Sequence, residues 1–322
     1  MKAFEIEQAG SVSGPPTPWD ELADRTFRAL ARASVWLILL LLVFILWSIG
    51  SKAWVGMRDY GLGFLTSTTW DVAKQQFGVL PQIWGTLYSS LLALMIGGFF
   101  GVVMAIFLTQ DFLPPRLAQV FRTTVELLAA IPSVVYGLWG LFVVVPAMRP
   151  VANWLYEHLG GIPFFGTTLS GPGLAPAAMV LAIMVLPTVA AVSQDALRLV
   201  PYRVKEAAYG MGATRWEAIL KVLLPAASTG IFGALVLGFG RALGETMALA
   251  MLIGNSNQIS LSLFSPANTL AALLALNFPE AGPREVPVLM YAALVLLAIT
   301  LVVNVIGEAI MTLSARRAGV RQ

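Results

Sequence analysis

The sequence predicts an all-α polytopic membrane protein with six transmembrane helices. Of its 322 residues, 58% are hydrophobic and only 11% are charged, whereas soluble globular domains carry about 25% charged residues. The mean hydropathy is also positive, at +0.80. Such a chain has more apolar surface than one soluble core can bury, so lipid must form part of its solvent.

Six segments are long and apolar enough to cross a bilayer, which takes about 20 residues. They are residues 33–50, 83–109, 127–148, 173–194, 227–253 and 287–307. The fifth segment alone holds internal charges, Arg241 and Glu245. We therefore expect a transmembrane domain over 33–313, with a cytoplasmic tail and amphipathic segment (1–32) before it and a short cytoplasmic tail (314–322) after it.

The distribution of lysine and arginine predicts the orientation. With a cytoplasmic N-terminus, fourteen of the twenty Lys and Arg residues fall inside, five fall outside, and Arg241 lies within the membrane. We therefore expect both termini and loop 196–226 in the cytoplasm. The Gly- and Pro-rich stretches 149–172 and 254–286 would then face outside.

Small residues and prolines within the spans predict how the helices pack. The spacings Gly97-x-x-x-Gly101 and Gly240-x-x-x-Gly244 would let two helix backbones approach closely. Pro132 and Pro187 predict kinks or interruptions, which are tolerated in a membrane where neighbouring groups satisfy the freed carbonyls.

Several classes of chemistry are disfavoured. The sequence has no cysteine and one histidine, His158, which argues against disulfides, Cys-ligated metal and Ser-His-Asp catalysis. It also has no Gly-x4-Gly-Lys-Ser/Thr motif for ATP phosphates. We expect a non-catalytic protein without cofactor or metal. A net charge of only +3 does not call for a nucleic-acid partner.

The cytoplasmic loop 196–226 is short but patterned. Glu206, Ala207 and Ala208 favour a helix, which Gly210 and Gly212 would then end. A second amphipathic stretch over 216–224 ends at Pro225. Two short helices joined at glycines suit insertion into a groove on a partner protein. The residues alone fit a hairpin packed against its own bundle equally well.

The charges within the fifth span are candidate functional groups. Arg241 lies about 20 Å along its helix, near the centre of a hydrocarbon core of about 30 Å, where a charge costs about 2.5–3.5 kcal/mol. Glu245 falls on the same helix face and would form a local ion pair. We interpret Arg241 as lining an anion pathway, because a guanidinium can bind two oxygens at once, with Glu245 and Thr246 assisting. A purely structural Arg–Glu bridge is the alternative.

The patterned loop resembles the coupling motif of type I ABC importer permeases, which reads Glu-Ala-Ala, then glycine, then Ile-x-Leu-Pro. The matching residues are Glu206, Ala207, Ala208, Gly212, Leu224 and Pro225, with Val222 in place of the isoleucine. The resemblance implies the MetI-like permease fold. It also implies that this loop docks on an ATPase subunit and transmits its closure to the membrane helices.

Other runs resemble the phosphate-specific members of that family, across about residues 80–313. They are Glu126–Leu141, which contains IPSVVYG, Leu181–Pro187, and Gly238–Ala248, which contains GRALGET. This resemblance implies a bacterial inner-membrane permease for phosphate. Its implied partners are a PstA-like second permease, two PstB-like ATP-binding subunits and a periplasmic PstS-like phosphate-binding protein. A permease for sulfate or molybdate is the nearest alternative, and an ion-coupled secondary anion transporter is a more distant one.

Overall fold

The computed structural model describes residues 17–110 and 112–317, so the parts of the expected tails at 1–16 and 318–322 lie outside it. The chain separates into two units, Met1–Ser51 and Lys52–Gln322, and each is described by itself. In the first unit the described residues form the beginning of α1 (Pro18–Tyr60). The second unit holds the end of α1 and all the other elements.

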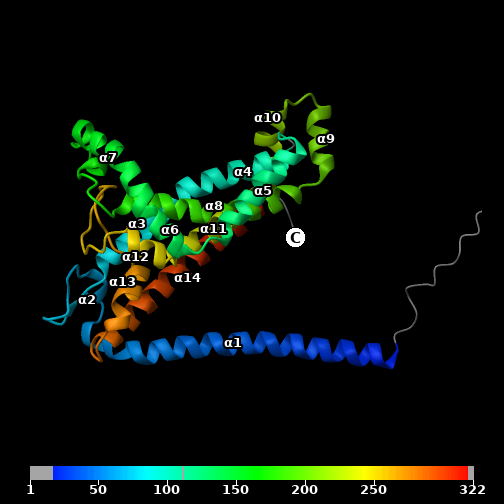
Figure 1. The fold of residues 1–322 in the computed structure, drawn as a ribbon. Helices are drawn as coiled ribbons and strands as arrows, with labels where there is room; N and C mark the ends of the chain where they lie inside the picture. Colours follow the sequence, from blue (N-terminus) through cyan, green and yellow to red (C-terminus); the bar gives the residue numbers. More distant parts are fainter. Residues whose placement is uncertain (1–16, 111, 318–322) are drawn as a thin grey trace, which may run out of the picture. The chain divides into compact units, whose positions relative to one another are not determined.

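The regular elements in the described part of the second unit are helices apart from one short hairpin, in which β1 (Trp70–Asp71) pairs antiparallel with β2 (Gln76–Phe77), and turns and irregular segments connect them. Figure 1 shows the helices in chain order. The α-helices after α1 are α2 (Gly63–Thr66), α3 (Leu80–Ala93), α4 (Phe99–Thr109), α5 (Pro115–Ala130), α6 (Ser133–Trp139), α7 (Val145–Leu159), α8 (Leu174–Arg198), α9 (Tyr202–Gly210), α10 (Arg215–Glu217), α11 (Leu224–Leu243), α12 (Met247–Leu252), α13 (Leu270–Asn277) and α14 (Glu285–Arg317).

Among the described residues, three of the spans contain a π-helical turn, and two short 3-10 turns lie outside the spans. The π-helical turns are η1 (Leu94–Gly98), η2 (Gly140–Val144) and η4 (Ala218–Leu223), and the 3-10 turns are η3 (Pro163–Phe165) and η5 (Phe278–Glu280). Each π-helical turn continues directly into the α-helix that follows it. Long helical rods therefore form from α3 with α4, from α6 with α7, and from α10 with α11.

Among the described residues, six helical stretches are long and apolar enough to cross a membrane, which confirms the predicted number. They are Pro18–Tyr60, Leu80–Thr109, Ser133–Leu159, Leu174–Arg198, Arg215–Leu243 and Glu285–Thr312.

Several span boundaries differ from the sequence expectation. The fifth span covers Arg215–Leu243 rather than 227–253, because the helix continues through Pro225 and ends at Leu243, and the third continues to Leu159 rather than 148. The amphipathic segment 21–32 and the span 33–50 form one uninterrupted helix, because no proline or glycine occurs between residues 19 and 49. The third span begins at Ser133 rather than at 127. Pro132 disfavours helical geometry in the residue before it, and Ile131 is accordingly extended, with ψ of 128°.

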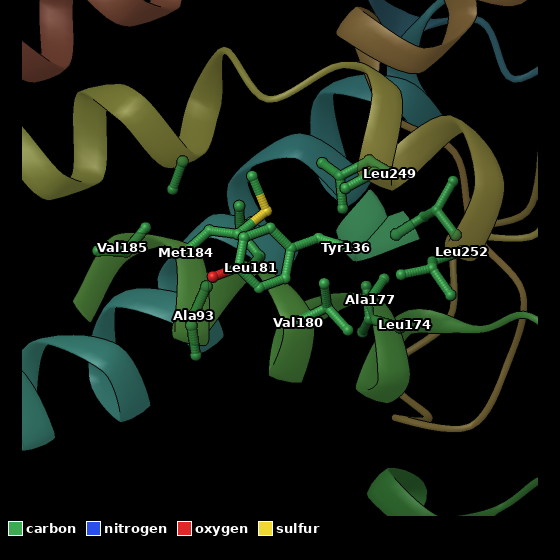
Figure 2. Packing of buried hydrophobic residues seen from close by; sticks show 14 of the residues in the cluster. Ala93, Tyr136, Leu174, Ala177, Val180, Leu181, Met184, Val185, Leu249 and Leu252 are labelled. Carbon is green, nitrogen blue, oxygen red and sulfur yellow. The ribbon is translucent and has the colours of Figure 1, made fainter. Parts of the chain in front are cut away.

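Helix α8 is central to the second unit and packs against α3, α4 and α11. Figure 2 shows its apolar side chains, including Val180, Leu181 and Val185, gathered around the ring of Tyr136. Glycines bring α4 and the turn before it close to α8. A Cβ on Gly97 would lie 2.3 Å from the Ala182 carbonyl oxygen, so the close approach predicted for this glycine is confirmed.

Candidate functional site

Arg241 lies in the last turn of α11, two residues before that helix ends. Its Nη1 donates a hydrogen bond to Oγ1 of Thr188 in α8, at 3.2 Å. The partial negative charge of a helix C-terminus favours a cation at this position. In the single chain the Arg241 side chain is exposed, and a guanidinium has five N–H donors. It can therefore donate further bonds to an oxygen-bearing anion.

Glu245 and Thr246 lie in the break between α11 and α12. Glu245 Oε1 accepts a hydrogen bond from the backbone N–H of Ala248 at 3.3 Å, and Thr246 Oγ1 donates to the Gly244 carbonyl at 3.1 Å. The ion pair expected between Arg241 and Glu245 is not among those formed by the described residues. Because α11 stops at Leu243, the helical i, i+4 geometry is lost, and Glu245 instead satisfies an amide in the first turn of α12.

The start of the third span lies beside this break. Helix α6 packs against α12, and Gly137 permits the approach, since a Cβ there would lie 3.3 Å from the Cα of Ala248. The Tyr136 hydroxyl donates to the Leu128 carbonyl at 2.9 Å, which ties α6 back to α5 across their interruption.

The backbone beside Arg241 is irregular where α11 ends and the chain passes through Gly244–Thr246 into α12. Helix α8, in contrast, continues without interruption through Pro187, which precedes the Thr188 that binds the guanidinium. Irregular backbone at membrane depth is tolerated where it is buried in protein or lines a water-filled cavity. In the described ranges 17–110 and 112–317, no cluster of three His, Asp or Glu residues could hold a metal ion. The arrangement suits charge-assisted hydrogen bonds to an oxyanion.

The first half of loop 196–226 forms α9 and presents an exposed face. Glu206 and Ala207 are exposed, whereas Ala208 is buried. Two large apolar side chains flank the helix and are almost fully accessible: Leu199 is 83% exposed and Met211 is 82% exposed. An acidic group beside protruding apolar side chains is a surface suited to a protein partner.

Helix α9 ends in a Schellman motif. The Gly212 N–H donates to the Tyr209 carbonyl at 2.9 Å, and the Ala213 N–H donates to the Ala208 carbonyl at 3.1 Å. Gly212 adopts φ of +84°, a conformation that glycine reaches at little cost. Gly210 is simply the last helical residue of α9. The helix is therefore ended by Gly212 alone, and not by both glycines.

The second half of the loop does not end at Pro225. Helix α10 begins with a capping box, in which Thr214 Oγ1 accepts from the Glu217 N–H and the Glu217 carboxylate accepts from the Thr214 N–H. The chain then continues through η4 into α11, which begins at Leu224 with Pro225 in its first turn. The expectation that this helix stops was wrong, because the π-helical turn accommodates a proline that lacks an N–H.

Two residues of these sites were missed from the sequence. Thr188 could have been found from the sequence, because its hydroxyl follows a proline directly in an otherwise apolar span. Arg215 was counted only as a cytoplasmic charge. It bonds the carbonyl of Gln110, 105 residues earlier, and no local pattern signals a contact of that kind.

Comparison with known proteins first defines the class. Residues 97–320 match the family described as binding-protein-dependent transport system inner membrane component. The fold resembles that of the inward-facing MetNI methionine ABC transporter, with a TM-score of 0.55 and 19% identity over 73% of this chain and 95% of that chain. A bacterial alginate ABC transporter gives a TM-score of 0.56 at 17% identity, over 89% of this chain and 98% of that chain. The fold is thus that of an ABC importer permease.

Relatives in sequence are closer. The phosphate transport system permease protein PstC of Mesorhizobium japonicum is 40% identical, over 92% of each chain. PstC of Haemophilus influenzae is 41% identical, over 86% of this chain and 89% of its own length. A probable PstC of Methanocaldococcus jannaschii is 36% identical, over 87% and 91% respectively. The chain belongs to the PstC family of phosphate transport system permease proteins.

Proposed function

We propose that this chain is the permease subunit that translocates inorganic phosphate across a bacterial inner membrane. Its energy comes from separate, PstB-like ATP-binding subunits, and a PstS-like periplasmic protein delivers the phosphate. The names of its PstC relatives support the substrate. The observation that carries the proposal within this chain is the exposed Arg241 guanidinium inside an apolar span.

An exposed arginine inside an apolar span also supports a second membrane subunit. A charge that faces hydrocarbon is unfavourable, by about 2.5–3.5 kcal/mol at the centre of a span, so we infer that the surface that carries Arg241 faces protein or water. A PstA-like permease packed on that surface would enclose the path between the two subunits. The anion would then pass between the chains rather than through this one.

The groups near Arg241 have distinct roles in the proposal. Arg241 binds two phosphate oxygens with its planar fork, while Thr188 orients the guanidinium. The Thr246 hydroxyl, now bonded to the Gly244 carbonyl, adds a donor when it rotates. Glu245 keeps negative charge beside the path, which weakens binding enough for the anion to leave.

The loop supplies the connection to ATP hydrolysis. The exposed Glu206 and the apolar side chains around α9 would enter a groove on the ATPase subunit. The proposal therefore includes a cytoplasmic position for loop 196–226 and for both termini, which the unequal distribution of Lys and Arg between the two sets of connecting segments supports.

The decisive experiment is phosphate uptake and phosphate-stimulated ATP hydrolysis in liposomes that hold the assembled complex. Arg241→Gln removes a charge-assisted interaction of about 1.5–3 kcal/mol, so we expect uptake to fall roughly tenfold to a hundredfold. Arg241→Lys keeps the charge but loses the planar pair of donors, so its phosphate uptake should lie between that of the wild type and that of Arg241→Gln. Glu206→Ala should lose stimulation of the ATPase. Arg58→Gln, at an exposed position at the end of α1, is the control.

The outcomes separate the alternatives. Normal uptake by an assembled Arg241→Gln complex would contradict the anion pathway and reduce Arg241 to a structural group. If sulfate or molybdate at equal concentration competed with phosphate for uptake, phosphate would not be the specific substrate. Uptake that continues without ATP would indicate an ion-coupled transporter.

A further inference from the structure

An arginine attaches the start of the second half of the cytoplasmic loop to the end of α4, beside the apolar packing of Ile219 and Leu223 against the bundle. Arg215 is the first residue of α10. Its Nη2 donates to the carbonyl of Gln110, and its guanidinium lies over the ring of Phe112, 4.0 Å from the centroid. Figure 1 shows α10 beside the end of α4. The loop is therefore joined to α4 by a contact as well as by its own continuation into α11.

The attachment is built from groups that resist sliding. Gln110 is the C-terminal cap of α4, so its carbonyl carries part of the negative end of the helix dipole. The Phe112 ring also packs against Trp216 and against Phe107, with centroids 5.1 Å apart in both pairs. A guanidinium stacked on an aromatic ring and bonded to a carbonyl has little freedom to reorient. Arg215, Phe112 and Trp216 are referred to below as the α4 clasp.

Helix α4 leads from the clasp toward Arg241. It packs along α8 with almost no space at Gly101, where a Cβ would lie 2.9 Å from the Val189 Cβ and 3.1 Å from the Leu186 carbonyl. Thr188 lies between those two residues and binds Arg241. A displacement of α4 along its axis would therefore move the part of α8 that positions the Arg241 guanidinium.

We propose that the α4 clasp is a positioning unit that transmits movement of the cytoplasmic loop through α4 and α8 to the Thr188–Arg241 pair. This inference rests on the proposed function, because it assumes that the loop moves with an ATPase. A second route runs from α10 through η4 into α11, and Ile219 and Leu223 of η4 also pack in one apolar cluster with α4. The clasp adds a polar and aromatic connection to the end of α4 at the start of this half of the loop.

The first test measures phosphate carried per ATP hydrolysed by the assembled complex. Arg215→Ala should lower that ratio at least fivefold, while the ATPase rate and the yield of complex stay within twofold of the wild type. Phe112→Leu should give a similar fall, and the double variant should fall no further, since both changes break the same contact. Lys221→Ala is the matched control, because Lys221 is exposed in the same segment and pairs only locally with Glu217.

A covalent substitute distinguishes positioning from a direct contact between Arg215 and the ATPase. The chain has no cysteine, so Phe112→Cys with Trp216→Cys places its only two thiols at the clasp. In an Arg215→Ala background, oxidation should restore the ratio of phosphate to ATP, and reduction should abolish it again. A disulfide that forms without restoring the ratio would overturn the proposal. Wild-type coupling in Arg215→Ala would do the same.

These results are separable from the proposed function. Loss of phosphate uptake by the wild-type complex would contradict the proposed function itself. A wild-type complex that transports phosphate, with Arg215→Ala and Phe112→Leu indistinguishable from it, would contradict the clasp alone.

Discussion

At the scale of single residues, the backbone angle φ of Gly212 explains why this glycine ends α9. Gly210 and Gly212 are two positions apart, and neither would bring a Cβ within 4 Å of another group. Only Gly212 has a positive φ, of +84°. The requirement for glycine there is conformational and has nothing to do with space.

A matched pair of substitutions tests that requirement. Gly212→Ala places an L-residue in left-handed geometry, which costs about 1–2 kcal/mol, and should loosen the end of α9. We expect faster amide exchange in α9 and weaker phosphate-stimulated ATP hydrolysis by the assembled complex. Gly210→Ala should leave both unchanged or slightly stabilise the helix, because alanine is the better helix former. Equal behaviour of the two variants would contradict this account.

The intramembrane residues show a different relation between sequence and role. Arg241 and Glu245 are four apart, yet they serve different elements, because the helix ends between them. Arg241 binds across to α8, and Glu245 binds forward to α12. Arg241 therefore connects α11 to α8, whereas Glu245 stabilises the start of α12.

At the scale of elements, the spans are interrupted helices that pack closely where glycines allow it. The spacing Gly97-x-x-x-Gly101 faces α8 in the structure, whereas Gly240-x-x-x-Gly244 does not form an equivalent contact. A Cβ on Gly240 would meet only the Asn304 side chain, at 3.3 Å, and one on Gly244 would meet only its own helix backbone. The Gly-x-x-x-Gly spacing therefore brings two helix backbones together in the second span but not in the fifth.

A stability measurement separates the two kinds of glycine. Gly97→Ala would place a Cβ 2.3 Å from the Ala182 carbonyl, so helix backbones must move apart, at a cost typical of overpacking, about 1–3 kcal/mol. Gly233→Ala is the control, since its Cβ would meet only the flexible Met311 sulfur, at 3.3 Å. We expect a lower apparent melting temperature of the detergent-solubilised complex for Gly97→Ala alone. An unchanged melting temperature would argue against tight α4–α8 packing.

At the scale of the whole molecule, much apolar surface of the second unit stays uncovered. Phe99 is 64% exposed and Phe142 is 71% exposed, values that water would not favour for such large rings. Lipid and partner subunits must therefore complete the burial.

The orientation can be measured because the chain contains no cysteine. Glu157→Cys, in the exposed end of α7, should react with a membrane-impermeant maleimide in right-side-out vesicles. Met211→Cys, in the loop, should react only after the vesicles are opened, with the permeases expressed without the ATPase subunit. The opposite pattern would invert the topology predicted from the Lys and Arg distribution.

The number of spans and the position of the patterned loop could be predicted from the sequence, as could the end of its first helix near two glycines, although the sequence did not show that Gly212 alone adopts the left-handed conformation. Each depends on local properties: the length of an apolar run against the bilayer thickness, and the steric limits of one residue's backbone. The interruption at Pro132 is of the same kind, because a proline restricts its immediate neighbour.

Only the tertiary structure decided which distant groups meet. The partner of Arg241 is Thr188 on another helix, the partner of Arg215 is the end of α4, and Pro225 lies inside a continuous helix rather than ending one. These outcomes depend on how separate spans pack together. A side chain bonds whatever group that packing places within reach, and the sequence around the residue carries no record of it.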